Sequence, residues 1–146
     1  MRLTAFTDYG LRTLMYLTIA SRRGTTCASV QTIAEALAVS PHHLSKVSQG
    51  LTLHGFIEAR RGRDGGLVLI REPATLTVGE VVRALEPSEL VPCFENPDAC
   101  LMTRGCGLAG ALAGAQRAFL SSLDAVTLAD CVAQPQALVR LVARAC

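Results

Sequence analysis

The chain has 146 residues, of which 50% are hydrophobic, and its formal net charge at neutral pH is +2. This length suits one compact domain or a small domain with an appendage, and the apolar content is ample for a buried core. The longest apolar run near the N-terminus, residues 13–20, is too short to cross a bilayer, and Asp8 and Arg12 before it interrupt a signal-peptide pattern. These features exclude a membrane span there, and we expect a globular, cytosolic (cytoplasmic) protein.

The two halves of the chain differ in charge. Residues 1–71 carry nine Arg and Lys against four Asp and Glu, a net charge of +5, whereas residues 72–146 carry five against eight, a net charge of −3. A basic half indicates contact with a polyanion such as nucleic acid. The six cysteines favour metal binding or redox sensing, because the cytosol keeps thiols reduced and disfavours disulfides.

Two helices are predicted before Ser40. Apolar residues at spacings of three and four predict a helix over residues 7–22 that ends at Gly24. Its apolar face consists of Leu11, Leu14, Met15 and Ile19. A short helix is predicted over residues 31–37, and a tight turn at Ala38 and Val39 follows it.

A third helix is predicted over residues 41–54, because Ser40 is a favourable N-cap, Pro41 suits the first helical position and Gly55 ends the pattern. We expect its apolar residues to face inward: Leu44, Val47, Leu51 and Leu53. Two helices joined by such a short turn form a helix-turn-helix.

A β-hairpin is predicted directly after the helix-turn-helix. Residues 56–60 and 67–70 have strand character, and residues 61–66 between them form a Gly-rich turn that contains Asp64 and Gly65. Thr77 then caps a short helix over residues 78–85 that Pro87 closes. Together these elements predict a winged helix-turn-helix domain over residues 1–87.

The remaining residues divide into a loop and a helical region. Residues 89–107 lose all periodicity and contain prolines, glycines and three cysteines. Beyond them, apolar residues recur at helical spacing: Leu108, Leu112, Ala115, Phe119, Leu123 and Val126. This stripe predicts a long dimerisation helix, and Thr127 with Asp130 resembles a capping box for a final helical segment. The predicted fold class is therefore mainly α with a small β-hairpin wing, with a cluster-binding loop over residues 88–107 and a helical region over residues 108–146.

The second helix of a helix-turn-helix enters the major groove with its N-terminal residues nearest the base edges. Those residues are Ser40, Pro41, His42, His43, Ser45 and Lys46. The wing adds Arg60, Arg61 and Arg63, which suit a narrow minor groove. The alternative for the histidines and for the wing is a solvated polar surface without a DNA partner.

Three cysteines lie in the Pro- and Gly-rich loop. They are Cys93, Cys100 and Cys106, and because Pro97 lies between the first two, a loop that wraps one centre is favoured over a helix face. Structural zinc usually takes closely spaced cysteine pairs, which this loop lacks, so zinc stays a weaker alternative. Iron-sulfur clusters tolerate more varied spacing and use four protein ligands.

The spacing alone leaves the fourth ligand open. The candidates are Asp8, His42, His43, Cys27, Cys131, Cys146 or a small molecule. Asp8 also has a purely structural interpretation, since it lies in a first helical turn and can pair with Arg12 at i,i+4. The structural alternative for the three other cysteines is a buried thiol.

Several stretches together resemble the iron-sulfur winged-helix regulators, a family that includes the nitric-oxide sensor NsrR and the cluster-assembly regulator IscR. The resemblance covers nearly the whole chain and rests on residues 3–12 (LTAFTDYGLR), 61–66 (RGRDGG), 81–87 (VVRALEP), 127–130 (TLAD) and the cysteine loop. IscR-like members carry a histidine ligand shortly after the third cysteine, but here residues 106–110 read CGLAG. The stretch around Asp8 resembles the NsrR-type branch instead, and the six-residue gap between Cys93 and Cys100 is a departure that leaves the cluster geometry open.

The resemblance implies a cytoplasmic homodimer with one iron-sulfur cluster, of the 4Fe-4S type, per subunit. Cys93, Cys100 and Cys106 would hold the cluster, and Asp8 would reach it from the partner subunit. Such a repressor binds a palindromic operator in double-stranded DNA and responds to nitric oxide. We hypothesise that nitric oxide first attacks the iron bound by Asp8, since a carboxylate is the weakest donor of the set. Loss of this tether would misplace one recognition helix.

The sequence alone leaves three other functions open. A regulator of the same class would sense iron-sulfur supply or redox state. An iron-sulfur electron carrier belongs to another class, and a zinc-stabilised interaction module to a third. No Gly-rich nucleotide fingerprint or nucleophile-base arrangement occurs in the sequence, so we expect no enzymatic activity.

Overall fold

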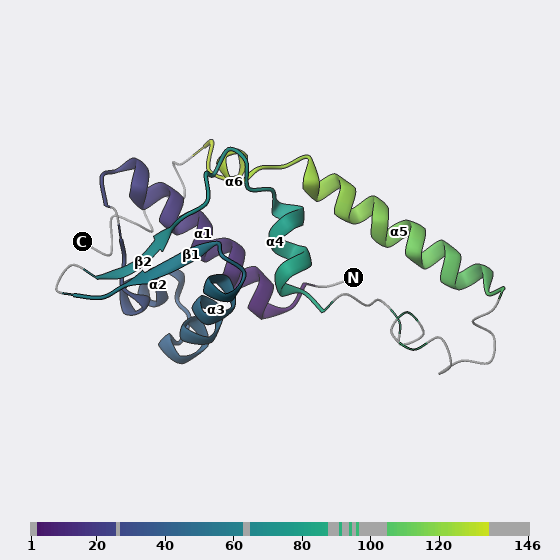
Figure 1. Ribbon diagram of the computed structural model, residues 1–146, viewed down its shortest axis with the longest axis horizontal. Helices are drawn as coiled ribbons and strands as arrows, with labels where there is room; N and C mark the ends of the chain where they lie inside the picture. Colours follow the sequence, from purple (N-terminus) through teal and green to yellow (C-terminus); the bar gives the residue numbers. More distant parts are fainter. Residues whose placement is uncertain are drawn as a thin grey trace.

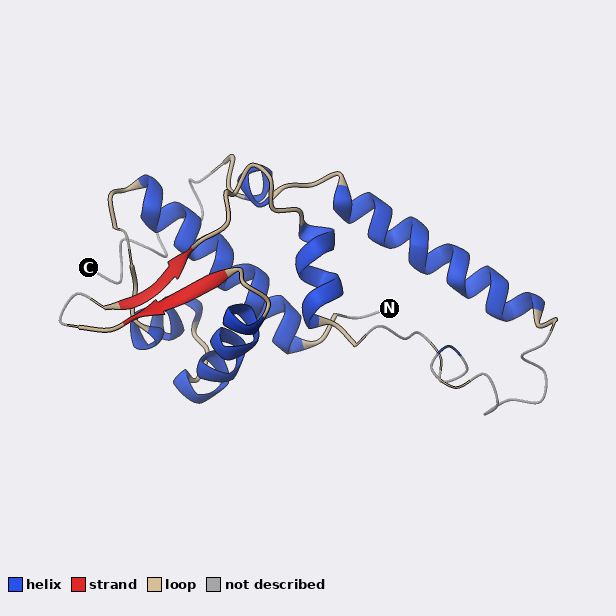
Figure 2. Ribbon diagram, viewed as in Figure 1, coloured by secondary structure: helices blue, strands red, loops and turns tan. Residues whose placement is uncertain are grey.

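The computed structural model describes residues 3–25, 27–62, 65–87, 91, 94, 96 and 105–134. The elements are α1 (Ala5–Arg22), α2 (Val30–Leu37), α3 (Pro41–Leu53), β1 (Ile57–Arg60), β2 (Gly66–Leu69), α4 (Val78–Leu85), α5 (Gly107–Asp124) and α6 (Leu128–Cys131). Figures 1 and 2 show a helical body with one hairpin. The predicted fold class is confirmed.

Helix α1 begins at Ala5, two residues before the predicted start, because Thr4 caps it. The Thr4 hydroxyl accepts a hydrogen bond from the Thr7 backbone N–H at 3.3 Å. The Glu86 carboxylate, just after α4, accepts hydrogen bonds from the Thr4 backbone N–H at 3.0 Å, from the Thr4 hydroxyl at 2.9 Å and from the Thr7 hydroxyl. We call this arrangement the Glu86 clamp. It joins the first turn of α1 to the end of α4.

The turn between α2 and α3 has the predicted form. Ala38 adopts a left-handed conformation with φ of 55°, and the Val39 N–H donates to the Ala34 carbonyl at 2.9 Å. The Ser40 hydroxyl caps α3 by accepting from the His43 N–H at 3.2 Å. The predicted helix-turn-helix is therefore present in the structure.

One prediction about α3 is wrong. Leu44, Val47 and Leu51 are buried, but Leu53 is 82% exposed. At about 100° per residue, position 53 lies about 180° around the helix from position 44. Leu53 therefore faces solvent despite its hydrophobic side chain.

The hairpin pairs β1 with β2 in antiparallel register, from Ile57 opposite Leu69 to Arg60 opposite Gly66. Each strand lies within one residue of its predicted bounds. Ala28 adds a third partner, since its N–H donates to the Leu67 carbonyl at 3.1 Å and its carbonyl accepts from the Leu67 N–H at 2.8 Å. The close backbone of Ala28 leaves no room for a Cβ at Gly66. These contacts fix the hairpin on the segment between α1 and α2.

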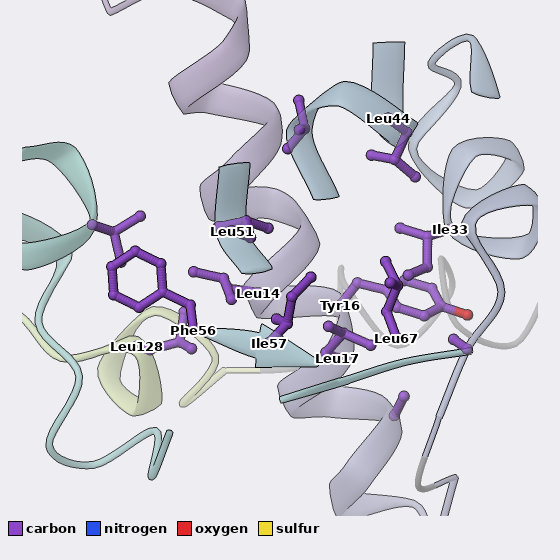
Figure 3. Close-up of a cluster of buried hydrophobic side chains, with 14 of the residues drawn as sticks. Leu14, Tyr16, Leu17, Ile33, Leu44, Leu51, Phe56, Ile57, Leu67 and Leu128 are labelled. Carbon is purple, nitrogen blue, oxygen red and sulfur yellow. The ribbon is translucent and has the colours of Figure 1, made fainter. Parts of the chain in front are cut away.

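The core lies between α1, α2, α3, the hairpin, α4 and α6 (Figure 3). Leu14, Ile33, Leu44 and Leu51 are all fully buried. The core also includes Leu128, whose N–H donates to the Leu76 carbonyl at 2.8 Å. The chain therefore returns from α5 to the body through α6, and the predicted capping box at its start is confirmed.

Helix α5 differs from the rest of the described chain, because none of its 18 residues is buried. It packs on α4 at its C-terminal end and extends away from the body, on the opposite side from β1 and β2 along the longest axis (Figure 1). It begins at Gly107 and ends at Asp124, slightly before its predicted end. Among the described helices, none has the length and apolarity needed to cross a bilayer.

Candidate functional site

The N-terminal residues of α3 form an exposed polar surface. Pro41, His42, His43 and Lys46 are exposed, and Ser45 is half-buried. The two imidazole rings have centroids 6.2 Å apart and planes tilted by 49°. Buried residues of the same helix hold this surface in place, so hydrogen-bonding and cationic side chains project from a rigid element. This arrangement matches a helix that reads base edges.

The wing carries two exposed arginines in the described residues, Arg60 and Arg61. Arg63 lies outside the described residues. Arg60 donates through Nε to the Glu58 carboxylate at 2.7 Å, a contact that sequence reasoning missed. The i,i+2 spacing is a signal that would have found it, because alternate residues of a strand share one face. A phosphate would compete with Glu58 for this guanidinium.

Asp8 lies in the first turn of α1 with its side chain 43% exposed. Its carboxylate contacts Arg12 Nε at 2.9 Å, which is the structural pairing considered from the sequence. An exposed pair of this kind contributes little to stability. The carboxylate is thus held at the surface in a way that leaves it accessible to another partner.

Cys106 is the N-cap residue of α5 and is half-buried. Its side chain makes no capping hydrogen bond, and Gly105 before it has φ of 92°. A thiolate at this position would lie near the positive end of the helix dipole. Cys106 is therefore well placed to act as an anionic ligand.

Cys93 and Cys100 lie outside the described residues, so the structure does not place the predicted ligands together. Over the part of the chain that is described, no three His, Cys, Asp or Glu side chains gather in a group suited to a metal. In one chain, the first turn of α1 lies in the body, whereas the first turn of α5 lies at the far end of the longest axis (Figure 1).

The remaining candidate donors have other environments. His42 and His43 belong to the exposed surface of α3, and Cys27 is half-buried beside the hairpin. Burial, together with the neighbouring Asp130, raises the pKa of the Cys131 thiol above its ordinary value. A thiol that keeps its proton is a poor ligand, which favours a structural role for Cys131. Cys146 lies beyond the described residues.

A model of the Rrf2 family, described as iron-dependent transcriptional regulators, matches residues 3–134. The chain belongs to the Rrf2 family. Members of this family are transcriptional regulators, so the protein is a regulator with a winged-helix DNA-binding fold rather than an enzyme.

Solved structures with the Rrf2 fold include three that align over most of both chains. A Listeria innocua protein described as a transcriptional regulator is 30% identical with a TM-score of 0.68, covering 92% of this chain and 88% of that one. CymR, described as the global cysteine regulator of B. subtilis, is 28% identical with a TM-score of 0.66, covering 91% and 97%. T. potens IscR has a TM-score of 0.72 over 94% and 90% of the two chains, and at 24% identity this likeness concerns the fold alone. Rrf2 membership therefore does not by itself assign an effector.

Proposed function

We propose that this Rrf2 protein is an iron-sulfur-cluster-containing transcriptional repressor of the NsrR type. It binds a palindromic operator as a homodimer and releases the operator when nitric oxide reacts with the cluster. The observation that carries the proposal is the accessible carboxylate of Asp8 in the first turn of α1, combined with a third loop cysteine that no histidine follows.

The exposed surface of α3 and the wing supports operator binding. Recognition by His42, His43, Ser45 and Lys46 would occur in the major groove, with Ser40 and Pro41 at the helix start. Arg60, Arg61 and Arg63 would contact the flanking minor groove or phosphates. The positive charge of residues 1–71 agrees with this division of roles.

The donor set fits a four-iron cluster. Such a cluster needs four protein ligands, and Cys93, Cys100 and Cys106 would supply three thiolates. Asp8 of a second copy would supply the fourth, because the starts of α1 and α5 lie apart within one chain. When bound, the cluster supplies iron that reacts with nitric oxide. Cys106 at the positive end of α5 and the accessible Asp8 are the chain's own contributions to holding it.

The first turn of α1 connects Asp8 to the recognition helix. The Phe6 ring packs so closely on α3 that a Cβ added at Gly50 would lie 2.7 Å from the ring. On its other side, the same turn is held to α4 by the Glu86 clamp. A change in the position of Asp8 would therefore move a turn that contacts both α3 and the C-terminal end of α4. This arrangement supports control of operator binding from Asp8.

The homodimer is supported by α5. Leu108 is 68% exposed, and no residue of this long apolar helix is buried in one chain. A second copy of the same helix would cover its apolar stripe. The two recognition helices would then meet half-sites about one helical turn apart or a multiple of that distance.

The decisive experiment is anaerobic purification with visible absorption and native mass, followed by nitric-oxide titration in the presence of a candidate palindromic operator. We expect a brown dimer that releases the operator as its cluster reacts. The Asp8→Ala protein should differ from wild type in its cluster spectrum and in its response to nitric oxide. Arg12→Ala is the matched control, because it removes the ion pair but leaves the carboxylate, and it should keep both properties.

Other outcomes favour the alternatives. An Asp8→Ala protein that matches wild type in spectrum and response would remove the basis for Asp8 as a ligand. Operator binding that ignores nitric oxide would favour a sensor of iron-sulfur supply or redox state. A protein that binds no DNA but reduces its cluster reversibly would be an electron carrier, and a colourless protein with stoichiometric zinc would be an interaction module.

A further inference from the structure

A salt bridge with two hydrogen bonds joins the C-terminal end of α5 to α4. Arg83 of α4 donates to both carboxylate oxygens of Asp124, the last residue of α5, at 2.6 and 2.5 Å. Two parallel N–H to oxygen bonds fix the relative orientation of the two groups as well as their distance. The contact therefore constrains the angle at which α5 leaves the body.

The protonation behaviour of the pair agrees with this geometry. The hydrogen bonds from Arg83 lower the pKa of the Asp124 carboxyl below its ordinary value, and those same bonds raise the pKa of Arg83. Both groups are therefore charged at neutral pH, as the two-bond geometry of the pair requires.

A glycine permits the close approach of the two helices. A Cβ added at Gly79 would collide with the Asp124 carboxylate and would lie 2.9 Å from the Asp124 backbone nitrogen. The end of α5 thus lies directly against the α4 backbone. Any larger residue at position 79 would force Asp124 to move.

The chain directly after Asp124 is fixed to the body as well. The Val78 N–H donates to the Val126 carbonyl at 2.9 Å, and Thr77 forms a bridge with Thr127. Leu128 follows and is 1% exposed in the core. The C-terminal end of α5 is therefore held from two sides, while the rest of the helix extends outward (Figure 1).

We propose that the joint formed by Arg83, Asp124 and Gly79 sets the half-site spacing that the protein accepts in its operator. The proposal rests on the proposed homodimer, in which α5 of one copy pairs with α5 of the other. In such a dimer, the angle between α5 and the body determines the separation and the rotation of the two recognition helices. One added base pair moves a half-site about 3.4 Å along the DNA axis and about 35° around it. The angle at this joint is consequently a determinant of specificity that touches no base.

The test measures affinity as a function of spacing. Full-length, cluster-loaded protein is kept anaerobic, and the probes are duplexes with two inverted copies of a half-site that wild-type protein has selected from random DNA. Wild type should prefer one spacing by about tenfold over its neighbours, and Asp124→Asn should reduce that preference to about threefold or less. Gly79→Ala should move the preferred spacing, because the added methyl displaces the end of α5. Arg83→Lys, which keeps the charge but loses the two-bond geometry, should behave like Asp124→Asn.

Glu80→Gln is the matched control. Glu80 is also on α4 and pairs with Arg71 at 2.8 Å with similar exposure, but Arg71 is not part of α5. This variant should keep the wild-type spacing profile. Native mass and circular dichroism of each variant distinguish effects on dimerisation and folding from an effect on the preferred half-site spacing.

Three results would overturn the proposal. Dimeric Asp124→Asn and Gly79→Ala proteins with the wild-type profile would show that the joint does not set spacing. A folded but monomeric Asp124→Asn protein would show that the pair holds the dimer together instead. A wild-type protein that is a monomer on native mass would contradict the proposed homodimer itself, and the two failures are thereby distinguished.

Discussion

The winged-helix body and α5 differ in how many of their apolar residues are buried. The body completely buries Leu14 of α1 and both Leu44 and Leu51 of α3, and it also buries Ile33 of α2 and Ile57 of the hairpin. Helix α5 is as long as α1, with 18 residues each, but it buries none of them and packs on α4 at its C-terminal end. Most helical stability in proteins comes from tertiary packing of an apolar face. The body therefore covers its own apolar faces, whereas the apolar stripe of α5 would be covered only in the proposed homodimer.

The sharpest way to test this contrast is to truncate one leucine in each region. Leu51→Ala empties a fully buried site and should lower the free energy of unfolding by about 2–5 kcal/mol at any protein concentration. Leu112→Ala in α5 should have an effect that depends on protein concentration, because it weakens association of two copies. Denaturant unfolding at several protein concentrations measures both effects. Equal, concentration-independent losses in the two variants would contradict the comparison.

A second contrast between the two regions concerns the contribution of their arginines to DNA binding. Arg61→Ala on the wing should weaken DNA binding several-fold and reduce the slope of log affinity against log salt by about 1, because one phosphate contact is lost. Arg117→Ala removes an exposed arginine from α5 and should leave both quantities unchanged. Binding isotherms at a series of salt concentrations compare the variants. Wild-type affinity and slope in the Arg61→Ala protein would rule the wing out as a DNA contact.

The smallest expected effect on stability concerns the start of α6, where the chain returns from α5 to the core. Hydrogen bonds from the Thr127 hydroxyl and backbone N–H lower the pKa of the Asp130 carboxyl. A lowered pKa in the folded state adds stability above the ordinary carboxyl pKa of about 3.9, and this stability disappears as the pH falls through the lowered value. Asp130→Asn should therefore be less stable than wild type at neutral pH, and the difference should vanish in acid. Urea unfolding from pH 7 downward checks this, and a difference that grows in acid would contradict the assignment.

Much of the fold could be predicted from local sequence patterns. Ser40 and Pro41 predicted the start of α3, and the pair of Thr127 and Asp130 predicted the start of α6, because a cap depends on residues within one turn. The prediction that Leu53 faces the core was wrong. Its hydrophobic character was counted without its angular position, and the helix turned it to solvent.

Contacts between distant residues could not be predicted from the sequence. The Glu86 clamp and the pair of Arg83 and Asp124 join residues 82 and 41 positions apart, and no periodicity relates them. For the candidate site, the structure places the N-terminal residues of α3 at an exposed helix end and pairs Asp8 with Arg12, while their contacts with DNA and with a cluster stay predictions. The predicted division into three segments and the cluster ligands stay predictions, since Cys93 and Cys100 lie outside the described residues.

The return of α6 to the body has a consequence for how this architecture can be recombined. Leu128 and Val132 lie in the same core as Leu14, although α5 separates them from the other core residues in the sequence. A shortened chain that stops after α4 would lack these two side chains and would expose Leu76 to water. Exchanging the segment between α4 and α6 with that of another regulator therefore requires two crossover points, one on each side of α5. In the order of the chain, α5 thus lies within the packed body and is not an attachment at its end.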